Sequence, residues 1–230
     1  MEPTSVATTE TPDIDLDSGL LAHYPLNGDA VDAGPSARHG EVAGAVPIAD
    51  RDGRPSGALL FDGIDDLVTL DDAGFAIDGD FSITMWVKGN PYSDHQWVLL
   101  SDHAAGECQP VTESWILRYT AEAGVFFSVY DQTTECGSHF GYGSLVSLDD
   151  DEWHHLALVA FDGILTIFLD CQEILVGEAP IGLPNGPHPL LAGNQSGAPE
   201  STAFDGALDE LRFYDRSIDL PVIDALCVEH

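Results

Sequence analysis

Residues 154–169 read HHLALVAFDGILTIFL, two apolar runs that meet at Asp162 and Gly163. An Asp-Gly pair between two such runs is a strong hairpin signal, because a tight type I′ turn needs positive φ at both central residues. We therefore expect two antiparallel strands here, over residues 154–161 and 164–169.

The same pattern extends outward from this hairpin along most of the chain. Short apolar runs with a period of two alternate with Gly, Asp, Asn and Pro, which is typical of β-strands and turns. The expected strands are Leu20–Pro25, Gly57–Phe61, Leu67–Thr69, Phe81–Val87, Trp97–Ser101, Trp115–Tyr119, Gly124–Tyr130, His154–Phe161, Ile164–Leu169, Gln172–Val176, Leu190–Gly193 and Ala207–Tyr214. One short helix is expected at residues 219–226. Strands without alternating helices predict an all-β fold, a two-sheet antiparallel jelly-roll sandwich.

The domain organisation follows from composition. Residues 1–18 contain few large apolar groups, so we expect a disordered acidic tail, followed by a single domain over residues 19–230. The Pro- and Gly-rich segment 180–189 is interpreted as a surface connection inside that domain, because the strands after it are too few to bury a core of their own.

The charge of the chain limits its partners. Asp and Glu number 40 against 7 Lys and Arg, a formal net charge of −33. Such a surface repels phosphate backbones and anionic lipid heads, so nucleic acid and acidic membranes are unsuitable partners. The longest apolar runs are also too short for a membrane-spanning helix. The acidity fits either adaptation to high salt or oxygen ligands for a hard cation such as calcium.

The four cysteines, Cys108, Cys136, Cys171 and Cys227, are too dispersed for paired metal-binding motifs and fit two disulfides better. Three pairings are possible. We prefer Cys108–Cys136 with Cys171–Cys227, because the first pair flanks one candidate hairpin. Four buried free thiols are the alternative. Disulfides would place the protein in an oxidising compartment, that is secreted, periplasmic or on the cell surface. The chain does not begin with an export signal, which is expected to lie outside this sequence.

Five segments in a fixed order resemble the LamG-like jelly-roll domains of the concanavalin A-like lectin and glucanase superfamily. They are an opening strand and loop, an FDGIDD turn, two central strands and a closing strand: Gly19–Asp32, Leu60–Val68, Phe81–Lys88, Trp153–Val159 and Phe204–Arg216. The resemblance covers residues 19–226 and supports the jelly roll. It leaves the function open, because this architecture serves lectins, adhesion domains and some glycosidases.

The resemblance implies a structural calcium ion between the opening loop and the closing strand. Asp29 and Asp32 would supply ligands from the loop, and Asp209 would supply one from the strand. The alternative is that these are solvated turn residues in an acidic chain. A second acidic group, Asp62, Asp65 and Asp66, is interpreted as a tight turn, since Asp side chains bond their own backbone there.

Residues 90–142 carry many aromatic and polar side chains, which a glycan site requires for stacking and for holding hydroxyl groups. We assign Trp97, Arg118, His139 and Tyr142 as the ligand-binding candidates, although aromatic residues that alternate along strands are more often core residues. Catalysis is not expected, because no carboxylate pair at strand spacing and no nucleophile motif occurs.

The sequence thus predicts a non-catalytic secreted or cell-surface module that recognises carbohydrate or an extracellular protein. A spacer domain without a ligand site is the first alternative, and a glycan-cleaving enzyme is the second.

Overall fold

The computed structural model describes residues 14–70, 76–91, 96–104, 114–130, 140–144, 146–180, 182–186, 188–197 and 202–228, with the side chains of 140–142 left out. In chain order the elements are β1 (Leu20–Tyr24), β2 (Glu41–Ala43), β3 (Val46–Ile48), β4 (Ala58–Asp62), β5 (Leu67–Thr69), β6 (Phe81–Gly89), β7 (Trp97–Ser101), β8 (Ser114–Thr120), β9 (Gly124–Tyr130), β10 (Phe140–Ser144), β11 (His154–Phe161), β12 (Ile164–Leu169), β13 (Gln172–Glu178), β14 (Leu191–Ala192), β15 (Asp205–Tyr214) and α1 (Leu220–Val228).

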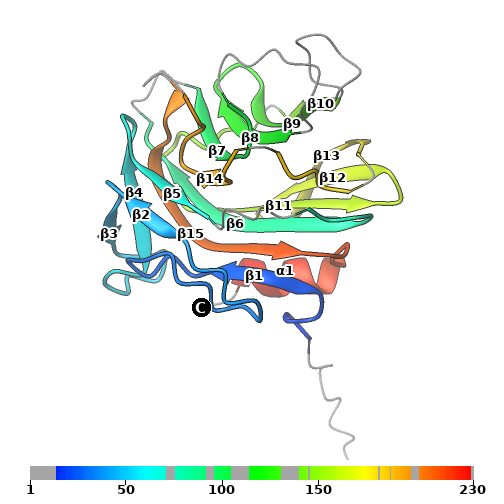
Figure 1. Ribbon diagram of the computed structural model, residues 1–230, viewed down its shortest axis with the longest axis horizontal. Helices are drawn as coiled ribbons and strands as arrows, with labels where there is room; N and C mark the ends of the chain where they lie inside the picture. The colour runs from blue at the N-terminus through cyan, green and yellow to red at the C-terminus, as the bar shows by residue number, and fades with distance from the viewer. Residues whose placement is uncertain are drawn as a thin grey trace, which may run out of the picture.

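The strands form two antiparallel sheets packed face to face, so the predicted sandwich is confirmed (Figure 1). Sheet A has the order β13-β12-β11-β6-β15-β4-β3, with β1 also paired to β15. Sheet B has the order β10-β9-β8-β7-β14-β5-β2. The closing strand β15 holds sheet A together, because it pairs with β6 along one edge and with β4 and then β1 along the other.

The β11–β12 hairpin forms as its sequence predicts. Phe161 pairs with Ile164, and the two turn residues Asp162 and Gly163 have φ of 48° and 76°. Positive φ at both positions is the requirement that favours Asp-Gly in a type I′ turn. The short strands β2 and β3 were not expected, because each has three residues and is largely exposed. The strand β10 was not expected either.

The main core lies between the sheets and includes Trp97, Trp115, Phe127 and Phe204. A second apolar cluster lies on the outer face of sheet A, where α1 covers β11 and β15 (Figure 1). The predicted Cys171–Cys227 disulfide is confirmed and joins the β12–β13 turn to α1. Cys108 and Cys136 lie outside the described residues.

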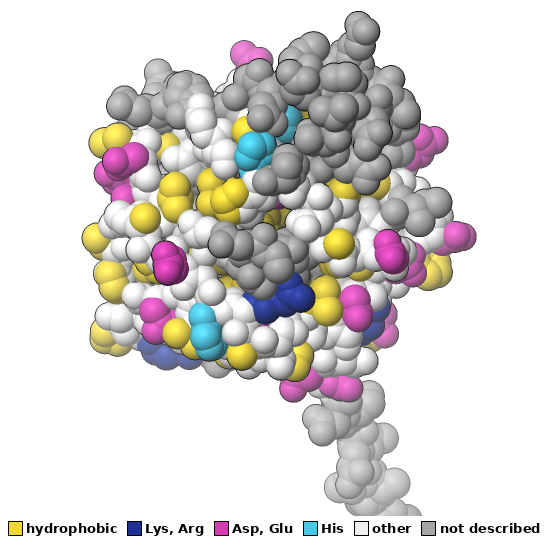
Figure 2. Space-filling view, in the orientation of Figure 1, with side chains coloured by type: hydrophobic (Ala, Val, Ile, Leu, Met, Phe, Trp, Pro, Cys, Tyr) yellow, Lys and Arg dark blue, Asp and Glu magenta, His cyan; other side chains and the backbone are white. Residues whose placement is uncertain are grey.

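The N-terminal tail is described from residue 14 onward. Leu16 packs against the cluster around α1, and the carboxylate of Asp15 accepts hydrogen bonds from the backbone N–H groups of Asp17 and Ser18. Leu16 therefore contacts the domain, while residues 1–13 of the expected disordered tail lie outside the described residues. No described helix is long and apolar enough to cross a membrane. On the face shown in Figure 2, the described carboxylates lie at separate places rather than in one patch.

Candidate functional site

Asp32 organises the opening loop that follows β1. Its side chain is buried, and Oδ1 accepts hydrogen bonds from the backbone N–H groups of His23 at 2.8 Å and Gly34 at 2.7 Å. Oδ2 accepts a third from the N–H of Arg38 at 2.7 Å. Both carboxylate oxygens are thus bonded to backbone donors that attach the loop to the first strand.

Asp29 and Asp209, the other two expected calcium ligands, have separate environments. Asp29 is exposed, and its Oδ1 accepts a hydrogen bond from the N–H of Val31 at 3.0 Å. Asp209 is buried in β15, where its Oδ2 lies 2.6 Å from Nη1 of Arg51. Among the described residues, these three carboxylates do not form a group whose ligand atoms lie within 4.8 Å of one another. As they are placed here, the three side chains are therefore not gathered into the one calcium site that the resemblance implies.

Among the described residues, one group of three carboxylates does have ligand atoms within 4.8 Å of one another: Asp62, Asp65 and Asp66. Asp66 Oδ2 accepts a hydrogen bond from the N–H of Asp62, and Asp62 Oδ1 accepts one from the N–H of Ile64, both at 2.9 Å. These bonds confirm the predicted tight turn. Burial, as the largest cause, raises the pKa of Asp66.

A buried charged cluster surrounds Asp209 on the outer face of sheet A. Arg51 also stacks over Trp86, 4.7 Å from the ring centre, and Glu210 bonds His23 at 2.6 Å and Arg212 at 2.8 Å. Burial raises the pKa of Asp209 to about 7, despite the charge of Arg51. Burial also works to raise the pKa of Glu210, but His23 and Arg212 outweigh it and lower the pKa.

Sequence reasoning missed Arg51 and this cluster. Arg51 lies in a polar loop between β3 and β4, and it is 158 residues from its partner Asp209 in the chain. Nothing in the local sequence distinguishes it from the other arginines.

The four ligand-binding candidates are not gathered into one site. Trp97 is fully buried in the core, stacked on Tyr119 with ring centres 5.0 Å apart, so it presents no surface to a ligand. This corrects the expectation for Trp97 and agrees with the alternative that aromatic residues on strands are core residues. Arg118 lies half-buried on the outer face of sheet B, 4.9 Å above the ring of Phe126.

The other two candidates are less fully defined. Tyr142 is in β10, where its backbone pairs with Phe127, but its side chain lies outside the described residues. His139 lies outside them altogether. Arg118 therefore remains the described candidate on an outer face, and its Nε is buried without a hydrogen-bond partner.

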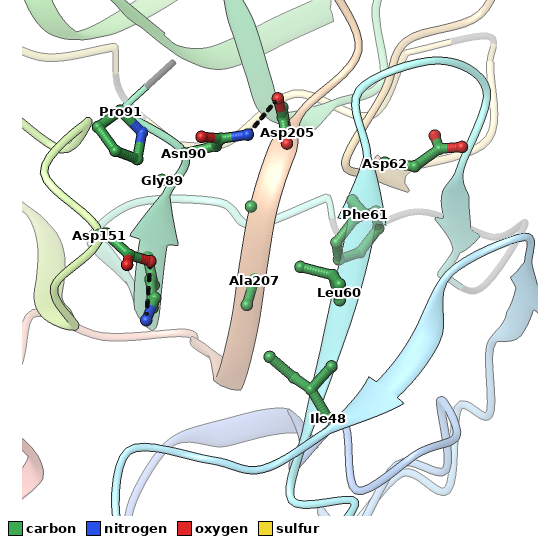
Figure 3. A pocket seen from close by; sticks show the side chains of 12 residues that line it. Ile48, Leu60, Phe61, Asp62, Gly89, Asn90, Pro91, Asp151, Asp205 and Ala207 are labelled. Carbon is green, nitrogen blue, oxygen red and sulfur yellow. Dashed lines mark hydrogen bonds and ion pairs between the residues drawn. The ribbon is translucent and has the colours of Figure 1, made fainter. Parts of the chain in front are cut away.

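A hollow of about 370 Å³ opens on the outer face of sheet A, over β4, β15 and the end of β6. Leu60 and Ala207 are paired in register and, with Ile48, form an apolar floor (Figure 3). Two polar pairs border this floor. Nδ2 of Asn90 donates to Oδ2 of Asp205 at 2.9 Å. Nζ of Lys88 lies 2.9 Å from Oδ1 of Asp151.

Backbone contacts set the position of these polar groups. The N–H of Asn90 donates to the carbonyl oxygen of Asp205 at 3.0 Å. The N–H of Asp151 donates to the carbonyl oxygen of Gly89 at 3.2 Å. Gly89 pairs with Gly206, and a Cβ atom on Gly89 would overlap the ring of Trp97. The end of β6 is thereby held against β15, with the side chains of residues 88 and 90 beside the hollow.

The hollow thus combines an apolar floor with fixed donors and acceptors, including an amide that offers both. Small-molecule sites have this composition, with apolar contacts for affinity and a few polar groups for orientation. Sequence reasoning missed it because Asn90 and Asp205 are 115 residues apart and meet only through the β6–β15 pairing.

The family model of the concanavalin A-like lectin/glucanases superfamily matches residues 62–223, and the chain belongs to this superfamily. No curated protein matches the sequence.

Several solved structures share the fold at low sequence identity. Domain 4 of AbnA, a GH43 extracellular arabinanase from Geobacillus stearothermophilus, solved in complex with arabinotriose, has a TM-score of 0.69 and 17% identity, over 92% of this chain and 99% of that one. The binding domain of Paraclostridial Mosquitocidal Protein 1 has a TM-score of 0.71 and 13% identity, over 93% and 52%. A mutant of Trypanosoma rangeli sialidase that displays trans-sialidase activity has a TM-score of 0.59 and 15% identity, and the match covers 91% of this chain and 33% of the sialidase chain. The fold therefore occurs both in binding domains and in proteins with catalytic activity.

Proposed function

We propose that this chain is a non-catalytic carbohydrate-binding module of an extracellular or cell-surface protein, and that the hollow on sheet A is its ligand site. The observation that carries the proposal is the apolar floor bordered by the Asn90–Asp205 and Lys88–Asp151 pairs. A sugar ring presents a face of C–H groups and a border of hydroxyls, and the hollow offers a surface complementary to each.

The charges around the hollow favour a neutral sugar. Lys88 is the cation among its lining residues, against the three carboxylates of Asp62, Asp151 and Asp205. The whole chain adds a formal charge of −33. An acidic saccharide would be repelled by this field, whereas hydroxyl groups can donate to the carboxylates and accept from the amide. The similarity in fold to an arabinanase domain solved with arabinotriose makes that neutral oligosaccharide a suitable first probe.

The partners of the carboxylates favour binding over catalysis at the hollow. A glycosidase uses one carboxyl group as a proton donor and a second as a base or nucleophile. Here Asp205 accepts a hydrogen bond from Asn90, and Asp151 pairs with Lys88, so both carboxylates are held by polar partners that also face a ligand. The Cys171–Cys227 disulfide supports an oxidising, extracellular location.

The test is isothermal titration calorimetry with arabinotriose, a panel of other neutral oligosaccharides and sialyllactose as the acidic comparison. We expect at least one neutral oligosaccharide to bind more tightly than sialyllactose. Asp205→Ala and Asn90→Ala should each weaken that binding about tenfold or more, as expected for loss of a hydrogen bond involving a charged group.

Asp224→Ala, which removes an exposed carboxylate of α1, is the matched control and should leave binding unchanged. Loss of binding in Arg118→Ala but not in Asp205→Ala would move the site to sheet B. Absence of binding across the panel would favour the spacer domain, and release of reducing sugar would favour an enzyme.

A further inference from the structure

An apolar groove lies on the outer face of sheet A, at the opposite end from the hollow. It has a volume of about 370 Å³ and runs between α1 and the β11–β12 hairpin. Its lining is mainly apolar: Val159, Phe161, Ile164, Phe168, Ile218, Leu220 and Ile223. The inner part is continuous with the cluster that holds α1 to the sheet, because Val159, Phe168, Ile218 and Ile223 are buried members of that cluster.

The outer part of the groove leaves large apolar side chains in solvent. Phe161 is 59% exposed, Ile164 49% and Leu220 55%. Val176, 56% exposed, extends the same face, because its partner in β12 is the lining residue Thr166. Contiguous exposed apolar surface of this kind on a soluble protein marks an interaction site more often than isolated exposed residues do.

Carboxylates border this apolar surface. Asp162 occupies the turn between Phe161 and Ile164, Glu178 pairs with Ile164 on the same face, and Asp219 precedes α1. All three are exposed. Arg216, a cation close to Asp219 in the chain, donates hydrogen bonds to the carbonyl oxygens of Ser18 and Ser217. The groove is therefore apolar inside and acidic at its border.

We propose that this groove binds a segment of a partner protein that carries large apolar side chains flanked by lysine or arginine. The apolar residues would cover Phe161 and Leu220, and the basic residues would face Asp162, Glu178 and Asp219. A second copy of this chain lacks that complementarity, because it also carries a formal charge of −33 and would be repelled.

The test uses the full chain and two labelled synthetic peptides of equal positive charge, one built from leucine and lysine and the other from serine and lysine. Fluorescence anisotropy should show the leucine peptide binding about tenfold more tightly or better, since each buried apolar side chain adds that order of affinity. Phe161→Ser and Leu220→Ser, which leave the charge unchanged, should each remove most of this advantage. Ile64→Ser, at an equally exposed isoleucine on the Asp62–Asp66 turn, is the matched control and should bind as the wild type does.

Several results would overturn the proposal. Equal binding of the two peptides would show that charge alone attracts them. Unchanged binding of the leucine peptide to both Phe161→Ser and Leu220→Ser would place the binding site outside the groove. If sedimentation shows that the wild type forms dimers and the Leu220→Ser variant does not, the occupant of the groove would be a second copy of this chain. Binding to phosphatidylcholine vesicles that depends on Leu220, without peptide binding, would make it a lipid surface. Leu220 lies at the exposed start of α1, so its variant stays informative if Phe161→Ser fails to fold.

Discussion

The opening loop and the hollow both contain an aspartate next to a strand, but the two carboxylates have different environments. Asp32 is buried, and its oxygens accept three hydrogen bonds from backbone N–H groups. Asp205 accepts one from the side chain of Asn90 and faces the open hollow (Figure 3). The comparison indicates that a carboxylate saturated by the backbone stabilises the fold, whereas one with unused lone pairs beside a hollow can bind a ligand.

The largest expected effect is on stability at Asp32. Asp32→Ala leaves three backbone N–H groups without their acceptor, one in β1 and two in the loop, so we expect the free energy of unfolding to fall by about 3 kcal/mol or more. Asp205→Ala, at a half-exposed position, should cost about 1 kcal/mol or less. Urea denaturation of both variants measures the difference, and similar losses in the two would break the distinction between structural and ligand-facing carboxylates.

The next loss, no larger than the one at Asp32, is expected at Arg51, which pairs with the buried Asp209. Arg51→Ala should cost about 3 kcal/mol at pH 8, because it leaves a buried carboxylate unpaired. The loss should shrink at pH 5, where Asp209 can be protonated. Denaturation at both pH values measures it, with the exposed Arg54 replaced by alanine as the control. A loss that does not depend on pH would show that packing on Trp86, rather than charge, is what Arg51 contributes.

A further effect concerns pH and Asp102, whose Oδ1 and Oδ2 accept hydrogen bonds from the N–H groups of Trp115 and Gly186. Burial raises its pKa from 3.8 to about 7. The folded state therefore holds the proton more tightly, and this contribution to stability is present below about pH 4 and is lost as the pH rises to about 7.

Asp102→Asn removes this titration. The stability of the wild type relative to the variant should fall by on the order of 2 kcal/mol between pH 4 and pH 7. Burial lowers the pKa of His155 to about 4, so its contribution to stability is lost as the pH falls, opposite to that of Asp102. This contribution is the same in the wild type and in Asp102→Asn, and it cancels in the difference between them. A constant difference across this range would show that Asp102 does not titrate in it.

The smallest expected effect is that of calcium. Because Asp29, Asp32 and Asp209 are engaged separately, melting in excess EDTA and in millimolar calcium should differ by no more than the change that magnesium causes at the same ionic strength. A calcium-specific rise that Asp209→Asn abolishes would restore the site implied by the family resemblance. A rise abolished by Asp62→Asn would place an ion at the second acidic turn.

The parts of this molecule that were predictable from sequence depend on local chemistry. Asp162 and Gly163 determine their own turn, and alternation defines most strands. Alternation fails at β7, where all five residues are buried and a bulge follows Val98, so the pattern does not show which face Trp97 occupies. The hollow was not predictable, because Asn90 and Asp205 meet only once the strand order is known.

The most direct test of the central claim is to map, by NMR on isotope-labelled protein, which backbone amides shift when the tightest-binding neutral oligosaccharide of the panel is added. We expect the largest shifts at residues 60–62, 88–91 and 205–207, with none above background in the loop around Asp32. Shifts centred on Arg118 and Phe126, or the absence of any localised shift, would contradict the assignment of the hollow as the ligand site.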